Sequence, residues 1–218
     1  MIVTQPDRVL LSQQVNRFAF HLTGTVLDVG GGDGRRYRES LRNAATYQSL
    51  DLNEALHPDI IGSAENIPLS ANSIDSILCT QVLEHVPYPE RVLAEIHRVL
   101  KPGGKALITV PQLNELHEEP HDYFRYTCFG LKRMLHDAGF QVTALEQRGS
   151  YYTCMAQLRI RRWIDRLQPY RNKWALWFLG PISLLYTRAA ILLDHLDTHA
   201  STRKHAIGWA VVVEKTAS

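Results

Sequence analysis

A cluster of glycines directly follows a short apolar run at residues 26–34 (VLDVGGGDG). Glycine lets the backbone approach a ligand closely, and a helix that begins after such a turn offers unpaired N–H groups. The segment therefore predicts a strand, a ligand-binding turn and a helix. The dinucleotide fingerprint G-x-G-x-x-G, counted from Gly30, needs a glycine where Arg35 stands, so the pattern of a nicotinamide dehydrogenase fails there.

Asp51 is the second residue suited to ligand chemistry. It lies at the end of the strand expected at 47–52 and about 20 residues beyond the glycine turn, where Rossmann-type folds place an acidic residue on ribose hydroxyls. A carboxylate accepts hydrogen bonds from both hydroxyls at once. Leu52 is placed to lie against an adenine ring, and the competing interpretation of Asp51 is a surface residue in a turn.

His85 is a candidate general base. With Glu84 it follows the strand expected at 74–80, at a point that a parallel sheet would bring to the ligand-binding edge. Histidine titrates close to neutral pH, which suits it to proton transfer. A structural role, in which the ring bonds to neighbouring backbone at a helix start, is equally compatible with this position.

The segment 117–126 (HEEPHDYFRY) is rich in ionisable and polar aromatic side chains. We expect His121 to act in catalysis or to orient an acceptor, together with Tyr123 and Arg125. The alternative is that Asp122 and Arg125 pair and brace the loop.

Metal binding is not expected. His85, His117 and His121 are candidate ligands, but no paired cysteines accompany them. The three cysteines are far apart and show no C-x-x-C spacing, so they predict neither a zinc site nor a disulfide framework.

The pattern along the chain alternates short β-branched runs with helical stretches, which predicts an α/β fold around a parallel sheet. Parallel strands gather the residues that follow them at one edge. Strands are expected at 25–29, 47–52, 59–62, 74–80, 105–110, 140–145 and 207–213, and helices at 9–21, 35–43, 90–100 and 127–138.

The region 150–203 differs in composition. A basic amphipathic stretch (LRIRRWIDRL) precedes the apolar segment 174–193, which Pro181 and Arg188 interrupt. Its uninterrupted pieces fall short of the ~20 apolar residues that a transmembrane helix needs. We expect paired helices that cover the sheet edge or the active site, with peripheral membrane contact as the alternative.

Overall composition is ordinary for a soluble protein, with 218 residues of which 45% are apolar and 21% charged. The formal charge of +2 indicates no nucleic-acid partner. The first 14 residues lack the continuous apolar core of a signal peptide. We expect a cytoplasmic protein, with the inner face of the membrane as the alternative location.

Several segments together resemble class I S-adenosylmethionine-dependent methyltransferases of the type-11 group. The spacing of Asp28 and of the glycines at 30, 32 and 34 resembles the first motif of that family. Residues 62–69 (GSAENIPL), 79–86 (CTQVLEHV) and 100–104 (LKPGG) resemble later motifs in the same order. The resemblance covers residues 25–145. It implies a Rossmann-like seven-stranded, mostly parallel sheet of order 3-2-1-4-5-7-6, flanked by helices, with a reversed final hairpin and a helical insertion before the last strand.

The resemblance also implies the cofactor S-adenosylmethionine, with S-adenosylhomocysteine as product. Asp28 would lie near the cationic amino group of the methionine moiety, and the glycine backbone would make room for it. Ser63 stands where the family usually has Asp, which weakens the expected adenine contact, whereas Ala64 still offers its backbone N–H. The implied cofactor contacts are Asp28, Gly30, Gly32, Gly34, Asp51, Leu52, Ser63, Ala64 and Gln81.

The expected reaction is methyl transfer to a small-molecule, sugar or lipid-linked acceptor. The stretch 121–127 resembles one in a methyltransferase subset, some members of which lie among cell-envelope sugar genes. Two alternatives stay open: a catalytically weak or inactive cofactor-binding protein that docks through its apolar insertion, and an NAD-dependent oxidoreductase. We expect a single domain over 1–218, comprising an N-terminal helical segment (1–24), a cofactor-binding core (25–149), a helical insertion (150–205) and a final strand (206–215).

Overall fold

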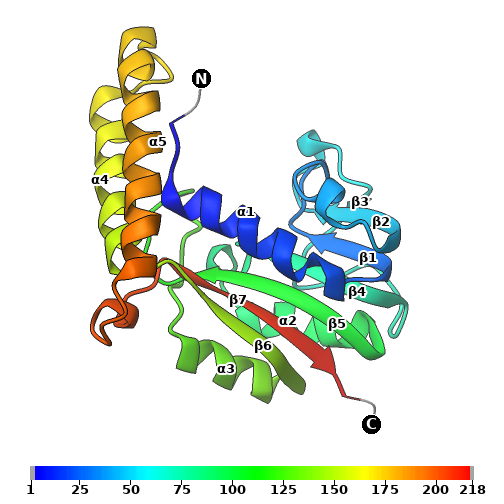
Figure 1. Ribbon diagram of the computed structural model, residues 1–218. Helices are drawn as coiled ribbons and strands as arrows, with labels where there is room; N and C mark the ends of the chain where they lie inside the picture. Colours follow the sequence, from blue (N-terminus) through cyan, green and yellow to red (C-terminus); the bar gives the residue numbers. More distant parts are fainter. Residues whose placement is uncertain (1–2, 217–218) are drawn as a thin grey trace. The chain divides into compact units, whose positions relative to one another are not determined.

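The computed structural model describes residues 3–216, and its seven strands form one mixed, mostly parallel sheet in the order β3-β2-β1-β4-β5-β7-β6 (Figure 1). The pairs β2–β3, β1–β2, β1–β4 and β4–β5 are parallel. The predicted fold class is therefore confirmed. The strands are β1 (Gly24–Val29), β2 (Ala44–Asp51), β3 (Ile60–Ile61), β4 (Ile74–Thr80), β5 (Leu100–Pro111), β6 (Phe140–Arg148) and β7 (Gly208–Lys215).

The start of β7 meets the ends of both neighbouring strands. The backbone N–H of Gln112, directly after β5, donates to the carbonyl oxygen of Ile207 at 2.8 Å, and the N–H of Ile207 donates to the carbonyl of Arg148 in β6 at 2.8 Å. Strand β7 is therefore antiparallel to both β5 and β6, as the reversed final hairpin requires.

The longer helices are α1 (Pro6–Phe18), α2 (Pro89–Val99), α3 (Cys128–Asp137), α4 (Tyr151–Leu167) and α5 (Lys173–Leu196). The helix expected at 35–43 is wrong, because that segment forms only a short 3₁₀ turn at Arg38–Ser40. The two large apolar side chains of this segment, Tyr37 and Leu41, are both buried without a longer helix. A longer helix would therefore bury no further apolar side chain to offset the conformational entropy that it costs.

Strand β5 begins earlier than the expected 105–110. Its pairing with β4 starts at Ile74 and Leu100, shifts register, and resumes at Ser76 and Lys105. The Pro-Gly-Gly segment, expected as a turn between a helix and a strand, is thus an irregularity within the strand. Extra residues on one strand are accommodated in this way without ending the pairing.

Contacts along the described chain divide it into two compact units. The sheet unit comprises Val15–Pro111, Leu116–Glu146 and the residues from Trp209 on. The helical unit comprises the residues up to Gln14, Gln112–Glu115 and Gln147–Gly208. The boundary between the two units thus falls within α1, between residues 14 and 15, and the domain organisation expected over 1–218 stays a prediction.

The core of the sheet unit lies between the sheet and two helices. Alternate residues of the strands, such as Leu27, Ile77 and Ile108, pack with the apolar faces of α2 and α3. Thr127 caps α3 as predicted, because its hydroxyl accepts the N–H of Gly130 at 3.1 Å. This rigid layer fixes the strand ends, which carry the candidate site.

The helical unit contains the expected pair of helices, which lie antiparallel (Figure 1). The carboxylate of Asp194, near the end of α5, accepts the backbone N–H groups of Ser150, Tyr152 and Thr153 at 2.9, 2.9 and 3.2 Å. A negative charge at a helix N-terminus is favourable. The two helices are thus joined at this end by a side chain as well as by packing.

Candidate functional site

The glycine turn of residues 30–34 follows β1 and is tied to the end of β2. The N–H groups of Gly30 and Gly31 donate to the carbonyl oxygen of Leu50 at 2.8 and 3.3 Å. Gly30 has φ +71°, and a Cβ there would lie 2.5 Å from Cγ2 of Val82. A Cβ on Gly31 would lie 2.7 Å from the carboxyl carbon of Asp28. Both positions therefore require glycine, although the family motif singles out only the first.

Asp28 lies buried beneath this turn. One carboxylate oxygen accepts the hydroxyl of Tyr47 at 2.5 Å, whereas the other has no hydrogen-bond partner among the described residues. Burial raises the pKa of Asp28 to about 7, against the opposing effects of the Tyr47 hydrogen bond and of Arg36. A cation bound nearby would stabilise the carboxylate, so the site fits an ammonium group.

Asp51 is held at the end of β2 beside the glycine turn. Its Oδ2 accepts the N–H of Gly32 at 3.0 Å and its Oδ1 accepts the N–H of Asn53 at 2.9 Å. Each oxygen keeps a second lone pair for a ligand donor. The neighbouring Leu52 is 73% exposed, which leaves its side chain accessible to a flat apolar group.

Ser63 and Ala64 lie in the turn after β3, near the same edge. The N–H of Gly62 donates to the carbonyl of Asp51 at 3.0 Å, which connects this turn to β2. The hydroxyl of Ser63 accepts the N–H of Glu65 at 3.1 Å and so closes its own turn. Ala64 packs partly against the main core.

Gln81 follows β4 with a left-handed φ of +55°. Its N–H donates to the carbonyl of Thr109 at 3.0 Å, and its side-chain amide donates to the Thr109 hydroxyl at 3.4 Å. Non-glycine residues in this conformation cost energy and gather at functional sites. The ends of β1, β2 and β4 are adjacent in register, so the structure brings the predicted cofactor residues to one edge.

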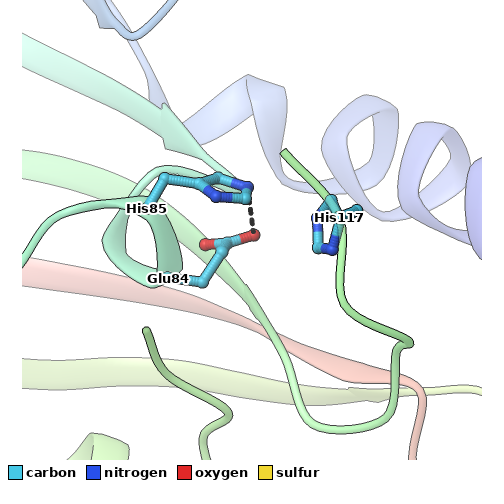
Figure 2. A group of neighbouring side chains, drawn as sticks. All are labelled: Glu84, His85 and His117. Atoms are coloured by element: carbon cyan, nitrogen blue, oxygen red, sulfur yellow. Dashed lines mark ion pairs between the residues drawn. The ribbon is translucent and has the colours of Figure 1, made fainter. Parts of the chain in front are cut away.

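His85 lies in a 3₁₀ turn (Leu83–His85) after β4, and its Nδ1 lies 2.7 Å from the backbone carbonyl oxygen of His121. A carbonyl can only accept, so Nδ1 carries the proton, and in the neutral form of the ring Nε2 is the unprotonated nitrogen. This Nε2 lies 4.0 Å from Oε1 of the buried Glu84 (Figure 2). The ring is therefore held in the tautomer that a general base needs.

Figure 2 also shows His117, whose ring lies edge-on to that of His85, with 4.8 Å between the ring centroids. One potential ligand atom from each of Glu84, His85 and His117 lies within 4.8 Å of the other two. Tetrahedral zinc with bonds of about 2.0 to 2.1 Å separates its ligands by about 3.4 Å, so this group is wider than such a site. Of the three histidines considered as ligands, His121 contributes its carbonyl to His85 instead, and the expected lack of a metal stays a prediction.

The loop 117–126 is braced by Asp122. Both terminal nitrogens of Arg125 donate to its carboxylate at 2.7 Å, and the N–H of His117 donates to it at 3.0 Å. The Arg125 guanidinium holds the pKa of Asp122 well below its ordinary value. The bracing pair considered from the sequence is therefore present, and acceptor binding by Arg125 stays a prediction.

The aromatic residues of this loop divide into exposed and buried ones. Tyr123 is 45% exposed, and its hydroxyl lies 3.2 Å from Nδ1 of the exposed His121. Tyr126 is buried and donates its hydroxyl to the carbonyl of Leu83 at 2.7 Å. The backbone N–H of Tyr123 donates to the carbonyl of Glu84 at 2.8 Å. The loop is thus fastened directly to the turn that carries His85.

Sequence reasoning missed Tyr47 and Tyr126 as parts of the site. Tyr47 could have been found from strand register, because Asp28 pairs with Ser49 and Tyr47 lies on the same face two residues away. For Tyr126 the only local signal was its place in an aromatic-rich loop.

Comparison with known proteins identifies the domain. The family model Methyltransf_11, described as a methyltransferase domain, matches residues 27–108. The phthiotriol/phenolphthiotriol dimycocerosates methyltransferase of Mycobacterium tuberculosis is 35% identical over 107 residues, which covers 39% of this chain and 40% of that protein. The chain thus matches less than half the length of this relative.

Solved structures share the fold over nearly the whole chain. The [4+2]-cyclase SpnF superposes with a TM-score of 0.62 at 21% identity, covering 97% of this chain and 81% of the cyclase. The 1,6-didemethyltoxoflavin-N1-methyltransferase of Burkholderia thailandensis, with bound S-adenosylhomocysteine, gives 0.58 at 15% identity, covering 97% and 80%. Residues 27–108 thus match the type-11 methyltransferase domain family, and the homologues and structural neighbours of the chain include class I S-adenosylmethionine-dependent methyltransferases.

Proposed function

We propose that this protein transfers a methyl group from S-adenosylmethionine to a small-molecule, sugar or lipid-linked acceptor. The observation that carries the proposal is the hydrogen bond from the Gly32 N–H to Asp51, which holds a carboxylate beside the same glycine turn that packs against the buried Asp28. One edge of the sheet thus offers acceptors for both a cationic amine and a pair of hydroxyls. NAD would use the second but has no ammonium group for Asp28.

The residues divide the work of holding the cofactor. Asp28 would stabilise the methionine ammonium, and Asp51 would accept the ribose hydroxyls. Leu52 would cover one face of the adenine, while Ser63 and Ala64 would meet its edge. The backbone of Gly30, Gly32 and Gly34 would leave room for the methionine and ribose portions, and Gln81 would line the same pocket.

S-adenosylmethionine supplies an electrophilic methyl group whose leaving thioether is neutral. The main task of the protein is therefore to hold the acceptor in line and to exclude competing geometries. Where the acceptor must lose a proton, Nε2 of His85 takes it, because the His121 carbonyl keeps Nδ1 protonated. Tyr123 and His121 are exposed beside this ring and would orient the acceptor, with Arg125 supporting the loop.

Calorimetric titration with S-adenosylmethionine, S-adenosylhomocysteine and NAD tests the proposal. We expect the first two to bind and NAD not to bind, and Asp51→Ala to weaken binding by at least tenfold. Asp137→Ala is the matched control, because Asp137 lies exposed on α3 and pairs with its neighbours His136 and Arg133.

Two results would contradict the proposal. Folded, ligand-free protein that binds neither S-adenosyl compound lacks the cofactor site. Protein that binds both but consumes no S-adenosylmethionine across a broad acceptor screen is a cofactor-binding protein instead of an enzyme.

A further inference from the structure

Helix α5 carries an apolar stripe along its outer side. Its large side chains recur every three or four residues, apart from one gap of seven between Leu185 and Leu192. This spacing places them on one helical face, and they are 44% to 77% exposed. At 1.5 Å per residue, the 24 residues of α5 extend about 36 Å. The outer stripe consists of Trp174, Trp177, Phe178, Ile182, Leu185, Leu192, Leu193 and Leu196.

The opposite side of α5 is packed within the helical unit. Leu179 joins Val3 and Ile160 in a small buried cluster, and small residues such as Ser183 and Thr187 are also buried there. By length and composition α5 could cross a membrane, and most of its apolar length is not buried by the described residues. An apolar helix that the fold does not cover is unlike the core helix of a soluble domain, and exposed apolar patches of this size mark interaction sites.

Charge indicates what covers the outer stripe. Residues 150–208 contain nine Arg and Lys but only three Asp, whereas the rest of the chain contains 15 basic and 19 acidic residues. The positive excess of the protein therefore lies in the helical region. Arg171 and Lys173 are exposed beside the first residue of the stripe, Arg188 is exposed within the stripe between Leu185 and Leu192, and Arg162 and Arg166 are exposed on α4.

Trp side chains with neighbouring basic residues are typical of the membrane interface. Indole rings lie at the headgroup level, and Arg and Lys bind anionic headgroups. Trp174 and Trp177 lie beside Lys173 at the start of α5. Insertion across the bilayer is disfavoured, because Asp194 joins α5 to the N-terminus of α4, and α4 carries exposed arginines that hydrocarbon excludes.

We propose that the outer stripe docks the protein on a bilayer surface that contains anionic lipids. The apolar side chains enter the boundary between headgroups and acyl chains, and α5 lies in the plane of the interface. This inference does not depend on methyl transfer. It gives the protein a peripheral location, at the inner face of a membrane, from which a lipid-linked acceptor would be within reach.

Flotation of the full-length protein with vesicles tests the proposal, without cofactor or turnover. We expect binding to vesicles of equal parts phosphatidylcholine and phosphatidylglycerol, and at least tenfold weaker binding to phosphatidylcholine alone. Added salt should weaken the anionic binding, because headgroup charges are screened. Failure here leaves cofactor binding untouched, so the two proposals are tested separately.

Matched variants locate the surface. Phe178→Asp is expected to reduce vesicle binding at least tenfold, whereas Phe129→Asp, at an exposed phenylalanine of α3, should leave it unchanged. Lys173→Gln should weaken anionic binding about fivefold, and Lys132→Gln on α3 should not, since each basic residue near the surface contributes about 1 kcal/mol.

A measurement on the unaltered protein guards against misfolded variants. Brominated lipids quench nearby indoles, so wild-type fluorescence should fall on anionic vesicles, and Trp177→Phe should reduce the fall. Equal binding by the two Phe variants, or no quenching, would overturn the proposal. The proposal would also be overturned if the protein did not bind vesicles but formed a dimer, detected by sedimentation, that Phe178→Asp dissociates. The outer stripe would then be a contact between two copies of the chain.

Discussion

The hydroxyl of Tyr47 donates a 2.5 Å hydrogen bond to the buried carboxylate of Asp28, 19 residues earlier in the chain. The bond opposes the desolvation that raises the pKa of Asp28 to about 7, and it leaves the second oxygen directed at no other described residue. The carboxylate is therefore poised to change charge near neutral pH, in a position where a ligand cation would favour the ionised form.

Cofactor affinity should depend on pH through Asp28. The ionised carboxylate pairs with the ligand ammonium, and the raised pKa means that protonation removes it as pH falls below about 7. S-adenosylhomocysteine affinity is expected to be constant above that value and to fall up to tenfold per pH unit below it. Calorimetry across this range checks the profile.

Two variants assign that profile to Asp28. Tyr47→Phe removes a bond to the ionised form and should move the midpoint to higher pH, whereas Asp28→Asn should flatten the profile and weaken binding. An unchanged midpoint in Tyr47→Phe would contradict the assignment.

Gly30→Ala should destabilise the protein more than Gly103→Ala. Both glycines have positive φ, +71° and +76°, so each substitution costs about 1 to 2 kcal/mol for the left-handed backbone. A Cβ at position 103 meets nothing within 4 Å, but one at position 30 lies 2.5 Å from Val82, which adds about 1 to 3 kcal/mol of overpacking. Denaturant unfolding measures both, and equal losses would refute the close approach.

His85→Ala should lower kcat by about 10² to 10⁴ and leave cofactor affinity unchanged, if the acceptor must lose a proton. His85→Gln could donate to the His121 carbonyl as Nδ1 does, but its amide cannot take the proton from the acceptor. This variant should therefore not restore activity. His136→Ala is a suitable control because that ring is exposed on α3. Steady-state kinetics with an identified acceptor decide this, and undiminished turnover would remove His85 from the mechanism.

Chelation should not change turnover. The ligand atoms of Glu84, His85 and His117 spread over 4.8 Å, wider than a tetrahedral zinc site. Dialysis against a chelator, followed by metal analysis and an activity assay, provides the measurement. Loss of activity that zinc or another divalent cation restores would show that these three residues close around a metal.

Tyr123→Ala and Arg125→Ala should differ in kind. Tyr123 holds the loop through its backbone N–H, so loss of its exposed ring should raise the acceptor KM without altering the free energy of unfolding. Arg125→Ala leaves the nearly buried Asp122 without its main partner, which should cost about 1 to 3 kcal/mol of stability. Kinetics and thermal unfolding of both variants separate the roles, and a stable Arg125→Ala protein would contradict the bracing interpretation.

Local patterns in the sequence predicted where the strands and the capped helix α3 lie. The order of the strands in the sheet came from the family resemblance. Strand β4 begins and ends at the predicted residues, 74 and 80, and the apolar residues that indicated it, Ile74, Ile77, Leu78 and Cys79, are all buried. Helix α2 was likewise predicted, since its apolar residues repeat with helical period. The predicted helix at 35–43 failed because two apolar residues are buried equally well by a turn.

Only the tertiary structure decided which distant groups meet. The tautomer of His85 depends on a carbonyl 36 residues away, and the charge of Asp28 depends on a hydroxyl in the neighbouring strand. Strand register and loop closure create these contacts, and no local periodicity encodes them. The sequence likewise did not determine that α5 has an exposed apolar stripe. An apolar run favours burial of a helix, but it does not specify which face of that helix the rest of the fold leaves exposed.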